Sequence, residues 1–140
     1  DKPSKELAFH RELYLHNPQC RAVVHLNCPY LTALSSLEGL DPQNCIRPFT
    51  PYVVMRGGAV PVVPYYKPGD IRLAQELARR AGAHRAFLLA NHGPVVTGTS
   101  LRQAADNLEE LEETARLMFT LGDRAIRYLT DGEVAELRDY

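Results

Sequence analysis

The sequence predicts a single domain of the α/β or α+β class. Segments typical of strands alternate with segments typical of helices, 45% of the 140 residues are hydrophobic, and no repeat or composition shift marks an inner boundary. A chain of this length can bury a sizeable core. No stretch approaches the ~20 consecutive apolar residues of a membrane-spanning helix. The net charge of −1 offers no basic surface, so neither a membrane nor a nucleic acid is an expected partner.

In the first half of the chain, proline and glycine mark the ends of most elements. Helices are expected over residues 4–17 and 31–37, and strands over residues 22–27, 52–56 and 60–63. The first helix begins at Ser4, a residue type that caps helices well, and it stops before Pro18. Two adjacent glycines at 57–58 predict a turn between the last two strands.

In the second half, capping residues mark the helix starts. Helices are expected over residues 70–81, 101–121 and from 131 onward, and strands over residues 86–90 and 95–97. Asp70 is a suitable N-cap for the first of these helices. Ser100 with Gln103, and Thr130 with Glu133, have the spacing of capping boxes before the other two.

The cysteines indicate a reducing compartment. Cys20, Cys28 and Cys45 form an odd set without C-x-x-C spacing, so we expect reduced thiols in a cytoplasmic protein. The first residues resemble neither a signal peptide nor a transit peptide.

Two histidines stand where a metal ion could bind. His25 and Asn27 lie two residues apart on the predicted strand 22–27, so both side chains point to one face, roughly 6–7 Å apart. Two imidazoles at this spacing chelate a metal well, but an asparagine amide is a far poorer zinc ligand. His92, in the turn after strand 86–90, offers another nitrogen. Taken singly, a histidine of this kind is more often a structural residue than a metal ligand.

Other polar residues also have two interpretations. Glu6 is a candidate acid–base residue, or simply a partner of the positive helix end. Cys28 should point to the opposite strand face as a small core residue, and it would replace the missing metal ligand only if the strand bulges. The glutamates at positions 109, 110, 112 and 113 predict a mostly solvated face of the helix over 101–121.

Five short motifs, read together, resemble the class II aldolase and adducin family. They are Lys-Pro-Ser-Lys-Glu (2–6), Val-Val-His-Leu-Asn (23–27), Thr-Ala-Leu-Ser (32–35), Pro-Tyr (64–65) and Leu-Leu-Ala-Asn-His-Gly (88–93). Their order and spacing match the family over essentially the whole chain. The longer runs Thr-Pro-Tyr-Val-Val-Met (50–55) and Pro-Tyr-Tyr-Lys-Pro-Gly-Asp (64–70) look like the branch of 3-oxo-tetronate 4-phosphate decarboxylases.

The resemblance implies a fold, an assembly and a ligand set. The fold would be a three-layer α/β/α domain with a mainly antiparallel sheet, and the assembly a homotetramer with active sites between subunits. Zinc would be held at the positions of His25, Asn27 and His92. Because Asn27 stands where the family has histidine, zinc binding should weaken, and Mn²⁺ or Mg²⁺ would suit an amide oxygen better.

The resemblance also implies substrate-handling residues. Ser4 and Lys5 correspond to positions that bind the substrate phosphate, at a helix N-terminus suited to anions. Glu6 corresponds to the catalytic glutamate, and Tyr52 to a tyrosine that donates a proton in a neighbouring subunit's site. The implied reaction is the loss of CO₂ from a 3-oxo-tetronate 4-phosphate through a metal-stabilised enediolate, giving a triose phosphate.

Two alternatives stay open at this point. An aldolase of the fuculose- or ribulose-phosphate type would use the same enediolate, and an adducin-like domain without catalysis would explain Asn27. The resemblance further implies roughly 60–80 residues before the first one. The 140 residues are therefore expected to form the C-terminal two thirds of the domain.

Overall fold

The structure is a computed structural model that describes residues 22–24, 28–56, 58–80 and 82–138. Within these ranges four strands form one sheet in the order β1-β4-β3-β2. They are β1 (Ala22–Val24), β2 (Val62–Val63), β3 (Ala86–Leu89) and β4 (Gly93–Gly98). β4 pairs antiparallel with β1 and with β3, whereas β2 pairs parallel with β3. The sheet is therefore mainly antiparallel, as expected.

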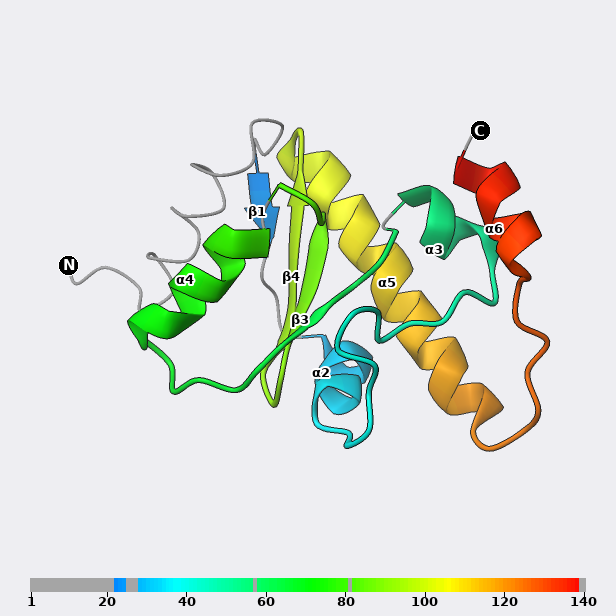
Figure 1. The fold of residues 1–140 in the computed structure, drawn as a ribbon, viewed down its shortest axis with the longest axis horizontal. Coiled ribbons are helices and arrows are strands. Elements are labelled where there is room, and N and C mark those ends of the chain that lie inside the picture. The colour runs from blue at the N-terminus through cyan, green and yellow to red at the C-terminus, as the bar shows by residue number, and fades with distance from the viewer. Residues whose placement is uncertain (1–21, 25–27, 57, 81, 139–140) are drawn as a thin grey trace.

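Helices cover both faces of this sheet (Figure 1). They are α2 (Pro29–Ser35), α4 (Ile71–Arg80) and α5 (Leu101–Leu121). Successive residues of a strand point to opposite faces. Phe87 and Leu89 of β3 accordingly pack in the cluster that contains α4, while Ala86 and Leu88 pack in the cluster that contains α2 and α5. This arrangement confirms the three-layer α/β/α fold.

Helix α5 forms where it is predicted. One side of the helix is an apolar stripe that is buried in the core and includes Ala104, Leu108, Leu111 and Ala115. The Ser100 hydroxyl accepts a hydrogen bond from the Gln103 N–H at 3.1 Å, and the Gln103 side chain accepts one from the Thr99 N–H at 2.7 Å. Both bonds satisfy donors at the helix start. A Cβ atom on Gly98 would lie 2.7 Å from the Ala104 nitrogen. Glycine at the end of β4 thus allows α5 to lie directly against the sheet.

The prediction of a strand over 52–56 is wrong, because this segment forms helix α3 (Pro51–Arg56). Proline fits the first turn of a helix, and Gly58, at φ 66°, donates its N–H to the Val53 carbonyl at 3.0 Å. The expected glycine turn is therefore a helix stop. Two β-branched valines favour a strand locally. The burial of Val53, which is 4% exposed, outweighs that preference.

The strand predicted over 60–63 is shorter in the structure. Only Val62 and Val63 pair with β3. Pro61 cannot donate to a ladder, although its carbonyl accepts from the Leu88 N–H at 3.0 Å. The other helices in the described part of the chain, together with β3 and β4, begin and end within two residues of their predicted positions, and β1 begins where it is predicted.

The C-terminal helix α6 (Asp131–Arg138) lies beside α3 (Figure 1). Its capping box is reciprocal, as predicted. The Thr130 hydroxyl accepts from the Glu133 N–H at 3.1 Å, and the Glu133 carboxylate accepts from the Thr130 N–H at 2.9 Å.

The helix predicted over 4–17 lies outside the described residues, as does the second half of the strand predicted over 22–27. Among the helices that the structure does describe, none is both long and apolar enough to cross a membrane. Cys28 and Cys45 are free and buried, whereas Cys20 lies outside the described residues. The cytoplasmic location stays a prediction.

Candidate functional site

Three strands end at the same edge of the sheet. β1 and β3 are both antiparallel to β4, and β2 is parallel to β3, so β1, β2 and β3 run in one direction. Their carboxyl ends meet at the lower edge in Figure 1, where the chain turns from β3 into β4. We call this the turn edge, formed by residues 64–70 after β2 and residues 90–93 after β3. The motifs at 64–65 and 88–93 both reach it.

His92 lies in the turn at this edge, as the sequence predicts. Its N–H donates to the Leu89 carbonyl at 3.0 Å, and its side chain is half-buried. Two unusual backbone angles flank it, a φ of 58° at Asn91 and of 142° at Gly93. Asparagine tolerates the left-handed region better than most residues, and glycine adopts either angle freely. The local sequence therefore specifies the tight turn that carries His92.

Helix α2 holds the turn from the other side. The Asn91 N–H donates to the Ser35 carbonyl, at the end of α2, at 2.9 Å. A Cβ atom on Gly93 would lie 3.2 Å from Oγ1 of Thr32. That Oγ1 atom is buried and has no hydrogen-bond partner among the described residues. Helix α2 therefore contacts the turn at both neighbours of His92, through its last carbonyl at Asn91 and through the Thr32 side chain at Gly93.

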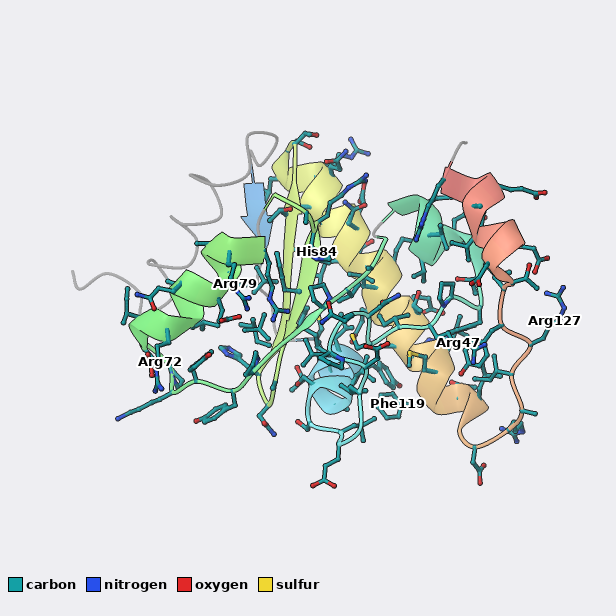
Figure 2. The ribbon with its side chains drawn as sticks, in the orientation of Figure 1. Arg47, Arg72, Arg79, His84, Phe119 and Arg127 are labelled. Carbon is teal, nitrogen blue, oxygen red and sulfur yellow. The ribbon has the colours of Figure 1, made fainter. Side chains whose placement is uncertain are left out.

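The loop after β2 completes the turn edge. The Ala90 N–H donates to the Val63 carbonyl at 3.0 Å, which ties the two strand ends together. Further along the loop, the Asp70 carboxylate pairs with the Arg72 guanidinium at 2.7 Å, and this guanidinium lies 5.2 Å from the centre of the Tyr66 ring (Figure 2). The hydrogen bond from Arg72 lowers the pKa of Asp70. The ion pair therefore keeps this acidic group charged and engaged in the loop.

Five of the predicted site residues lie outside the described part of the chain. They are Ser4, Lys5, Glu6, His25 and Asn27. The structure does establish the direction of the strand that leads to the last two. Val24 of β1 pairs with Val96 of β4, and β1 runs toward the turn edge. Within the described ranges, no three histidine, cysteine or acidic side chains gather closely enough to hold a metal.

Tyr52 is described, but it does not lie at the turn edge. It is 57% exposed on α3, and it lines a small pocket with Arg85 and Asn107, next to the beginning of β3. His92 follows the other end of β3. In one chain, therefore, the structure does not bring Tyr52 and His92 together.

Cys28 is a small core residue, as the sequence predicts. It is 8% exposed and packs in the cluster with Leu31 and Leu108. Burial raises the pKa of its thiol, and the nearby Glu112 carboxylate raises it further. Both effects disfavour the thiolate, which is the form that binds metals.

Glu112 is the residue whose importance the sequence interpretation missed. Its two carboxylate oxygens accept from the backbone N–H groups of Tyr30 and Leu31, at 3.1 Å and 2.9 Å. Its neighbour Glu113 instead pairs with Arg116 on the surface, as expected of a solvated face. The sequence feature that could have revealed this role is spacing. Position 112 falls four residues after Leu108 on the apolar stripe, and residues four apart are neighbours on a helix surface.

Known proteins resemble this chain closely. A family model described as the class II aldolase and adducin N-terminal domain matches residues 1–119. The 3-oxo-tetronate 4-phosphate decarboxylase of Pectobacterium atrosepticum is 68% identical over 137 residues, which cover 98% of this chain and 63% of that protein. The chain therefore spans just under two thirds of this relative's length.

Solved structures agree in fold. The crystal structure of YgbL from Klebsiella pneumoniae matches with a TM-score of 0.96 at 74% identity, over 99% of this chain and 67% of that one. An L-fuculose 1-phosphate aldolase matches with a TM-score of 0.85 at 26% identity, over 98% of this chain and 63% of that one.

Proposed function

Because this chain belongs to the class II aldolase and adducin family, we propose that it forms part of a decarboxylase acting on a 3-oxo-tetronate 4-phosphate. The observation that carries the proposal is its 68% identity to a protein of that name, against 26% to an L-fuculose 1-phosphate aldolase of the same fold. The enzyme class that we propose is a metal-dependent carbon–carbon lyase.

The turn edge is the proposed metal site. His25, Asn27 and His92 would hold one divalent ion there, since the first two follow β1, which runs toward the turn that carries His92. Two imidazoles suit zinc, and the amide oxygen of Asn27 also suits Mn²⁺ or Mg²⁺. When bound, such an ion would act as a Lewis acid on the substrate's ketone oxygen.

The reaction requires one bond cleavage and one proton transfer. The bond between the carboxylate carbon and C2 breaks, CO₂ leaves, and the electron pair moves through C2 and C3 onto the ketone oxygen. A proton must then reach C2 to give a triose phosphate. Glu6 is the proposed acid–base residue, while Ser4 and Lys5 would hold the phosphate at their helix start.

Tyr52 is the second proposed proton donor, acting in the site of a neighbouring subunit. Its position supports this role, because it is 57% exposed and lies at the opposite end of β3 from His92 in its own chain. A homotetramer with sites between subunits would use such an outward-facing tyrosine. Tyr52→Phe should then abolish proton donation without changing the metal content.

Aldol cleavage of a ketose 1-phosphate is the second candidate function. The structural match to an L-fuculose 1-phosphate aldolase favours it. It needs the same metal and the same electron movement, but the bond that breaks joins two carbons of a sugar and releases an aldehyde.

Turnover by the full-length protein separates the candidates. Metal content is measured first, and 3-oxo-tetronate 4-phosphate is then supplied with Zn²⁺, Mn²⁺ or Mg²⁺ while triose phosphate is detected by a coupled enzyme. Fuculose 1-phosphate and ribulose phosphates are tested in parallel. We expect turnover of the oxo acid alone. Cleavage of a sugar phosphate instead would favour the aldolase, and the absence of both metal and turnover would indicate a domain without catalysis.

A further inference from the structure

The carboxylate of Glu112 provides the N-terminal hydrogen bonds of α2 that the local sequence lacks. The first N–H groups of any helix have no partner inside it. In α2 the first position is Pro29, which has no N–H, and the Cys28 side chain makes no capping bond. The next two N–H groups, of Tyr30 and Leu31, both donate to Glu112. One side chain of α5 thus satisfies the start of α2 from 81 and 82 residues away in sequence.

A ring contact reinforces this attachment. The Tyr30 and Phe119 rings lie 6.2 Å apart between centroids, and Figure 2 shows Phe119 where α5 passes α2. The start of α2 is therefore fastened to α5 by two charge-assisted hydrogen bonds and one aromatic contact.

Helix α2 connects the two segments that carry the proposed metal ligands. Its N-cap, Cys28, directly follows Asn27 in sequence, and its last carbonyl, that of Ser35, accepts from Asn91, which precedes His92. Seven helical residues span ~10 Å at 1.5 Å each, and a helix is rigid over that length. Any shift of the start of α2 would therefore be passed to its end, which contacts the turn that carries His92.

We propose that Glu112 is a positioning residue for the active site: by holding the start of α2, it holds the helix against which the turn that carries His92 packs. The inference rests on the proposed function, since the position of His92 matters to the chemistry only if this residue binds a metal. Metal–ligand bonds tolerate deviations of only about 0.2 Å. Loss of Glu112 should therefore weaken metal binding and the chemical step together.

The test compares two neighbouring glutamates in the full-length protein. Glu112→Gln leaves one acceptor for two donors, whereas Glu113→Gln removes the same charge from a side chain that is 52% exposed. Zn²⁺ affinity is measured by calorimetry, and kcat and KM at saturating metal, well below the unfolding temperature. We expect Glu112→Gln to weaken Zn²⁺ binding and to lower kcat, each by about tenfold or more, with a smaller change in KM. Glu113→Gln should stay within about twofold of the wild type on each measure.

Three outcomes would overturn the inference. One is a Glu112→Gln variant that unfolds at a lower temperature but binds Zn²⁺ and turns over like Glu113→Gln, which would make the role merely structural. If Glu112→Gln does not fold, Glu112→Asp takes its place, because it keeps both carboxylate oxygens on a shorter side chain. This variant should show a smaller loss of Zn²⁺ affinity and of kcat, and wild-type values of both would contradict the inference. A wild-type protein that binds no metal would refute the proposed function as well, which distinguishes that failure from the other two.

Discussion

Replacing Gly93 by alanine is expected to destabilise the protein and to displace His92. Gly93 has a φ of 142°, a region that side chains with a Cβ atom rarely adopt, and the new Cβ would lie 3.2 Å from Oγ1 of Thr32. Backbone strain of this kind costs about 1–3 kcal/mol. The crowding adds less, because 3.2 Å is only a few tenths of an ångström short of an ordinary contact.

The expected total is about 2 kcal/mol, or roughly 5–10 °C in Tm for a domain of this size. The strain falls on the residue that follows His92, so kcat should decrease as well. The assay is urea unfolding of the variant with kcat measured in parallel on the folded protein.

Two control variants isolate the causes. Gly39→Ala has similar strain at a φ of 77°, but a Cβ there meets nothing within 4 Å, so it should lose about 1 kcal/mol without loss of kcat. Gly132→Ala lies in the first turn of α6, where a Cβ would make only an ordinary contact 3.9 Å from Oγ1 of Thr130, and should be neutral or slightly stabilising. A Gly93→Ala protein with wild-type stability and kcat would refute the reasoning about the turn.

Three further predictions test the caps, the buried thiol and the metal ligands. Ser100→Ala removes the acceptor for the Gln103 N–H and should cost about 1 kcal/mol in urea unfolding, whereas no loss would mean that Gln103 alone caps α5. Burial raises the pKa of Cys45 from 9.0 to about 12, so the free energy of unfolding should fall as the pH rises through that range. Cys45→Ala should remove this part of the loss of stability at alkaline pH. Urea unfolding at pH 8 to 11 measures the difference between the two proteins. Asn27→His should raise Zn²⁺ affinity at least about tenfold in calorimetry, and an unchanged affinity would favour a domain that has lost its metal site.

Local signals predicted the elements whose ends are fixed by caps. Ser100 and Thr130 mark helix starts in the structure as they do in the sequence, because a capping hydroxyl acts within one turn. Local signals failed at α3, where the buried position of Val53 depends on packing against the core that forms around α5. Local signals could not predict the strand order either, since the pairing of β1 with β4 joins residues more than 70 positions apart.

In the candidate site, too, local sequence predicted some features, and contacts between distant segments set the others. His92 lies in a turn that its neighbours Asn91 and Gly93 specify, and the sequence predicted that turn. The role of Glu112 arises from contacts between distant segments. A glutamate on a helix usually faces water, so only its place on the apolar stripe distinguished it from Glu113. The separation of Tyr52 from His92 likewise depends on α3 being a helix at the far end of β3.

The central claim is that the turn edge of the sheet is the site of a metal-dependent decarboxylation. The most direct measurement is the release of labelled CO₂ from carboxyl-labelled 3-oxo-tetronate 4-phosphate by the full-length protein and by its His92→Gln variant, with the bound metal quantified in both. We predict one CO₂ for each triose phosphate formed by the wild type. The variant should lose most of its metal and nearly all of its CO₂ release. Equal release by the two proteins, or triose phosphate formed without CO₂, would contradict the account.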